Sequence, residues 1–100
     1  MNDSDYKLLD KAAKALYRIF NSHASDAKTI AAITKPLKDM VRIQEEEAAY
    51  MLVMSIETLQ DIGVSAPLIK TLVDDLASEA LATGNAQLST FLKTEIIPTL

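Results

Sequence analysis

The segment Ala48–Ile56 constrains the fold more than any other part of the chain. If it is helical, its apolar side chains form three stripes about 100° apart, so the helix is apolar on nearly all sides for about two and a half turns. A surface helix of a small protein can hide only one broad stripe. Either the other helices of the chain enclose this segment, or a second copy or another protein covers one stripe.

The remaining sequence predicts helices on both sides of this segment. Strand signals are nearly absent, because the chain has four Val, no sustained alternation of apolar and polar residues, and no Asn-Gly or Asp-Gly turn. Apolar spacing and capping residues predict a first helix from Asp3 or Ser4 to about Ser22 and a second over 26–34.

Pro36 is the expected start of the longest helix. Proline lacks an amide hydrogen and disfavours helical geometry in the preceding residue, so it either starts a helix or kinks one. We favour a break there. Nothing interrupts the helical pattern again before Gly63, which predicts one helix over 36–62, roughly 39 Å long.

Two further helices are predicted after Gly63. Ser65–Gly84 has the clearest pattern of the chain, with a double apolar row opposite a polar side that carries Asp74, Asp75 and Glu79. A last helix over 86–97 is expected to bury four side chains, which are Leu88, Phe91, Leu92 and Ile96. The predicted fold class is therefore all-α: a single helical domain over 1–100, built as a compact, mostly antiparallel bundle of four to five helices around the long central one.

Composition excludes several classes of function. Without Cys, the chain cannot form disulfides, thiolate nucleophiles or Cys-based metal sites. Its net charge of −4 lies in residues 51–100, and an acidic domain repels DNA and RNA. The longest apolar run has seven residues, against about 20 for a bilayer span, and the N-terminus does not resemble a signal peptide. We expect a soluble cytoplasmic protein with neither nucleic acid nor membrane as partner.

Few residues of the chain are candidates for catalysis or metal binding. The single imidazole, His23, lies in a predicted loop, which is more typical of a capping or solvent-exposed residue than of a catalytic one. Consecutive acids at Glu45–Glu47 point about 100° apart and cannot converge on a metal. Arg42, three and four residues earlier, is expected to pair locally with Glu45 and Glu46. There is no Gly-rich phosphate loop and no nucleophile with a visible base. We expect no enzyme, no cofactor and no metal site.

The sequence favours a non-enzymatic protein–protein interaction module of the inhibitor, adaptor or chaperone type. Its first candidate surface is the stripe of the long helix that carries Met40, Ile43, Tyr50 and Met54, which we expect to form a two-fold homodimer because Met and Tyr are common at interfaces. The second candidate surface is the acidic group Asp74, Asp75 and Glu79, which would dock on a basic protein.

In size and helical layout the chain resembles bacteriocin immunity proteins and some phage-encoded inhibitors. Either resemblance implies a small inhibitor protein. A rival from another class is a small-molecule binder or a carboxylate-metal enzyme that uses the interior of the bundle. Asp74, Asp75, Ser78 and Glu79 share one helix face, but Mg²⁺ and Ca²⁺ sites need more convergent oxygens than one exposed helix face offers.

Overall fold

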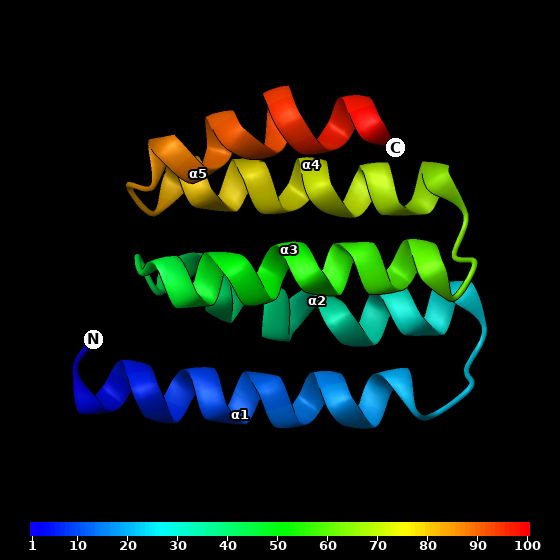
Figure 1. Ribbon diagram of the computed structural model, residues 1–100, viewed down its shortest axis with the longest axis horizontal. Helices are drawn as coiled ribbons and strands as arrows, with labels where there is room; N and C mark the ends of the chain where they lie inside the picture. Colours follow the sequence, from blue (N-terminus) through cyan, green and yellow to red (C-terminus); the bar gives the residue numbers. More distant parts are fainter.

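Five stretches of the chain form α-helices in the computed structural model, which describes all 100 residues (Figure 1). The helices are α1 (Asp3–Phe20), α2 (Asp26–Arg42), α3 (Glu46–Asp61), α4 (Ala66–Ala82) and α5 (Ala86–Phe91). After α5 the chain continues through a π-helical segment, Leu92–Ile96, and a 3-10 turn, Ile97–Thr99. Consecutive helices run antiparallel (Figure 1). The predicted all-α bundle of four to five helices is confirmed.

Local signals in the sequence explain where most helices begin and end. Side chains accept hydrogen bonds from first-turn amides at three helix starts: Asn2 for α1, Ser25 for α2 and Asn85 for α5. The cap of α1 is thus Asn2, whereas the sequence predicts a start at Asp3 or Ser4. Gly63 and Gly84 follow α3 and α4 with φ of +87° and +86°, a conformation that costs other residues about 1–2 kcal/mol.

The predicted break at Pro36 and the single helix over 36–62 are both wrong. Helix α2 continues through Pro36, whose ring is buried, and the chain reverses instead at Ile43–Glu45. Ile43 (φ −84°, ψ 100°) and Glu45 (φ −134°, ψ 147°) have extended backbones, which end the helical hydrogen-bond ladder. Pro36 removes only one such bond from α2, and the residue is buried.

Apolar burial explains why the chain reverses at Ile43–Glu45. In a straight rod the two halves would lie end to end and their apolar sides could not contact each other, whereas the reversal packs one against the other. Seven apolar side chains on the two sides of the turn are at most 2% exposed: Met40, Val41, Ile43, Ala48, Leu52, Ile56 and Leu59. Each large one contributes about 1.5–3 kcal/mol, and the few backbone hydrogen bonds lost at the turn cost about 1 kcal/mol each. The free energy gained by burying these side chains therefore exceeds the cost of the lost hydrogen bonds.

Helix α2 lies at the centre of the bundle. It packs against α1, α3 and α4, and α5 packs on α4. In Figure 1, α3 lies in front of α2, while α1 and α5 form the two edges. The molecule is flat, with extents of 35 × 28 × 18 Å. The chain therefore covers the inner side of α3 with its own helices, and no helix covers the outer side.

We predict that Leu76→Ala lowers the free energy of unfolding by about 2–5 kcal/mol, because Leu76 is fully buried in the centre of α4. The matched control is Leu81→Ala, since Leu81 lies on the same helix but is exposed. This control should change stability by less than about 0.5 kcal/mol. Urea titration measures both values, and equal losses would contradict this orientation of α4.

Candidate functional site

The outward side of α3 combines apolar and acidic side chains. We call it the α3 outer face, and it consists of Glu46, Glu47, Tyr50, Met54, Glu57 and Asp61, all exposed. Tyr50 is 67% exposed and Met54 is 45% exposed, which is unusual for side chains of this size. Helix α3 contains no Lys or Arg, and none of the four carboxylates of this face takes part in an ion pair within the chain. The face is therefore negative and partly apolar.

A groove runs beside this face, between α3 and α5. Both helices pack on α4 but scarcely on one another, which leaves a groove of about 720 Å³. Its apolar lining consists of Ala49, Tyr50 and Val53 from α3 and Leu88 and Phe91 from α5. Toward the start of α3 the lining turns polar and acidic, with Gln44, Glu45 and Glu46.

Phe91 corrects an expectation from the sequence. It was expected to be buried with Leu88 and Leu92, but it is 40% exposed at the groove, whereas the two leucines are buried. Its spacing from Leu88 is typical of a core residue, so the apolar pattern alone could not distinguish it. It is exposed because only α4 covers this end of α5.

The stripe predicted for a two-fold dimer does not exist as one surface. Met40 is 1% exposed and Ile43 is 2% exposed, so both belong to the core. Tyr50 and Met54 lie beyond the chain reversal, on another helix, and are exposed. The four residues share one helix face only if 36–62 is a single helix, and that helix is absent.

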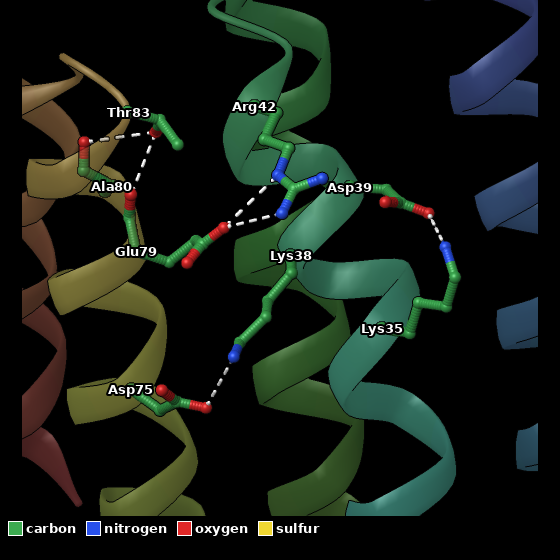
Figure 2. Close-up of polar contacts among 8 residues, drawn as sticks. All are labelled: Lys35, Lys38, Asp39, Arg42, Asp75, Glu79, Ala80 and Thr83. Carbon is green, nitrogen blue, oxygen red and sulfur yellow. Dashed lines mark hydrogen bonds and ion pairs between the residues drawn. The ribbon is translucent and has the colours of Figure 1, made fainter.

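The acidic side of α4 is largely occupied by ion pairs with α2 (Figure 2). Asp75 Oδ2 lies 3.2 Å from Lys38 Nζ. Glu79 Oε1 accepts hydrogen bonds from Arg42 Nε at 3.2 Å and Arg42 Nη2 at 3.0 Å. The expected local pairing of Arg42 with Glu45 and Glu46 is therefore wrong. Of the three acids predicted to dock on a partner, Asp74 alone forms no ion pair.

The contacts at the chain reversal join α2 and α4 at one end of the bundle. Besides the Arg42–Glu79 pair, Gln44 Nε2 donates to the carbonyl oxygen of Thr83 at 3.0 Å, beyond the last residue of α4. The Glu45 carboxylate lies 3.3 Å from the amino group of Met1. Glu45 is thus partly neutralised, and Glu46 carries the unpaired charge at this end of the groove.

His23 lies at the opposite end of the bundle. It adopts φ +54° in the α1–α2 loop and lines a smaller hollow of about 320 Å³ together with Phe20, Asp26 and Ile62. Asp26 Oδ2 already accepts a hydrogen bond from the Ser65 backbone amide at 3.2 Å. No group of three or more His, Asp or Glu side chains is arranged to hold a metal ion.

Comparisons with protein-family models, with curated proteins and with solved structures give no match for this chain. None of the helices is both long enough and apolar enough to span a membrane.

We predict that Glu79→Lys lowers the free energy of unfolding by about 1 kcal/mol, because it replaces an ion pair with two like charges between α2 and α4. Adding Arg42→Glu should recover most of the loss by restoring a pair of opposite charges. Asp74→Lys serves as the control and should stay within about 0.5 kcal/mol of the original chain. Chemical denaturation measures the free energy of unfolding of all three variants. A double variant no more stable than Glu79→Lys alone would show that the pair does not join the helices.

Proposed function

We propose that this chain is a non-enzymatic protein-interaction module that binds an amphipathic helical segment with basic residues in the groove between α3 and α5. The observation that carries the proposal is an apolar groove with exposed Tyr50 and Phe91 that lies beside the α3 outer face, whose carboxylates have no ion-pair partners within the chain. Inhibitors, adaptors and chaperones can all act through such a preformed surface.

The apolar lining supports a helix as the occupant. Amphipathic helices bind in grooves by inserting side chains spaced three and four residues apart. Tyr50 and Phe91 line the groove from opposite helices, where they can contact such side chains from two sides. Aromatic side chains are enriched among the residues that dominate binding energy at interfaces.

The charges support a basic partner. Glu46 lines the groove, and Glu47, Glu57 and Asp61 follow on the outer face of the same helix, without any Lys or Arg on α3. A surface of one sign attracts segments of the opposite sign and accelerates their association, and salt weakens this effect. The acids of α4 contribute less, because Asp75 and Glu79 already pair with α2.

The size and helical layout that resemble bacteriocin immunity proteins and phage-encoded inhibitors are compatible with this proposal, since an inhibitor docks on another protein. A carboxylate metal site has less support, because no side-chain group is arranged for it. A second copy of the chain is a further candidate occupant of the groove, and the experiment below distinguishes it.

The test uses a fluorescent peptide of about 18 residues, five helical turns, with Leu on one face and Lys on the other. Its control has the same composition in scrambled order, without an apolar face. We expect the amphipathic peptide to bind at least about tenfold more tightly than the control, a difference of about 1.4 kcal/mol, in fluorescence anisotropy at moderate salt. Equal binding of the two peptides would reduce the interaction to charge alone and contradict the proposal.

Variants of the chain locate the binding site. Phe91→Ala should weaken amphipathic-peptide binding by about tenfold or more, because aromatic anchors often contribute over about 1.4 kcal/mol. Leu81→Ala, at an exposed apolar residue of α4, should leave binding unchanged. Circular dichroism checks that both variants fold. Unchanged binding by Phe91→Ala would place the peptide elsewhere. Self-association of the original chain that is lost in Phe91→Ala, without any peptide, would identify a second copy as the native occupant, because Phe91 lines the groove but does not belong to the α3 outer face.

A further inference from the structure

Helix α1 carries a continuous basic line on its outer side. We call it the α1 basic face, and it consists of Lys7, Lys11, Lys14 and Arg18, all exposed. Their spacings of four, three and four residues place them on one side of the helix, opposite the buried Leu9 and Leu16. Lys14 pairs with Asp10 at 2.9 Å, and the other three make no ion pair within the chain.

The α3 outer face is complementary to the α1 basic face in charge and in length. Eleven residues separate Lys7 from Arg18, and eleven separate Glu46 from Glu57, which corresponds to about 16.5 Å of helix in both cases. Both ends of one face can therefore meet opposite charges on the other at the same time. Between those ends, Tyr50 and Met54 offer apolar surface to the aliphatic stems of the lysines.

We infer that the chain associates with itself, through contact of the α1 basic face of one copy with the α3 outer face of another. The two faces lie on different sides of the molecule, with α1 along one edge and α3 in front of α2 (Figure 1). Such a contact between two different patches is heterologous and can continue from copy to copy. One helix on another makes a small interface, below about 1,200 Å² in total, so the association is transient.

This inference goes beyond the proposed function, because it assigns a role to α1, which takes no part in the groove. It also replaces the two-fold dimer through Met40, Ile43, Tyr50 and Met54 that the sequence predicts. Of those four residues, only Tyr50 and Met54 remain in the contact.

The salt dependence of self-association gives the first test. Copies with a net charge of −4 repel one another, so an association without charge complementarity strengthens as salt screens the repulsion. Docking of the α1 basic face on the α3 outer face predicts instead that salt weakens the association. We expect sedimentation equilibrium to show an average mass above that of the monomer at about 0.01 M salt, where the screening length is about 30 Å, and the monomer mass at about 1 M, where it is about 3 Å. A monomer at low salt, or association that rises with salt, would overturn the inference.

Charge reversal on each face gives the second test. One variant carries Lys7→Glu, Lys11→Glu and Arg18→Glu, and the other carries Glu46→Lys, Glu57→Lys and Asp61→Lys. Each variant alone has two faces of the same sign and should be monomeric at low salt. An equal mixture has complementary faces again and should associate. Self-association of either variant alone, or failure of the mixture while circular dichroism shows both folded, would overturn the inference.

The α1 variant also separates this inference from the proposed function. Its groove is intact, so it should bind the amphipathic peptide as the original chain does. If the original chain binds the peptide but does not self-associate, the proposed function holds and the contact between copies is wrong. If it self-associates but does not bind the peptide, the contact between copies holds and the proposed function is wrong.

Discussion

The packing of α3 against α2 is the interaction on which the rest of the structure depends. It requires the chain to reverse at Ile43–Glu45, and the burial of apolar side chains on both sides of the reversal outweighs the interrupted backbone ladder. With α3 on one side of α2, α1 and α4 pack on its remaining sides. Helix α5 then packs on α4. The same reversal separates Met40 and Ile43, which become core, from Tyr50 and Met54, which become surface.

Ion pairing separates structural charges from those available to a partner. Lys38 and Arg42 of α2 pair with Asp75 and Glu79 of α4, so these acids mainly help two neighbouring helices to pack. The acids of the α3 outer face have no ion-pair partners within the chain, and on the α1 basic face only Lys14 has one. A flat bundle, 18 Å in its shortest extent, exposes these unpaired charges on different sides. That separation is why both a basic partner and a second copy are reasonable occupants of its surfaces.

Local signals in the sequence were sufficient for the helical class and for α4, because the apolar row after Ser65 and the stop at Gly84 do not depend on distant residues. They fail at Pro36, because the preference of proline to start or kink a helix is weaker than the stabilisation from burying Pro36 within α2. One local signal for the true reversal was present: Arg42 suits the last turn of a helix, and Glu46 and Glu47 suit the first turn of the next. The groove was not predictable from local patterns, because it results from α3 and α5 both packing on α4.

The distance between the start of α2 and the end of α3 tests the central claim most directly, because the two lie at the same end of the bundle only if the chain reverses between them (Figure 1). The chain has no Cys, so spin labels on Lys28→Cys and Gln60→Cys would be unique, and both sites are exposed. Packed helix axes lie about 8–10 Å apart, so pulsed electron paramagnetic resonance should give a label distance below roughly 25 Å. A helix continuous from α2 through α3 would place the two sites about 48 Å apart, and a distance near that value would contradict the account.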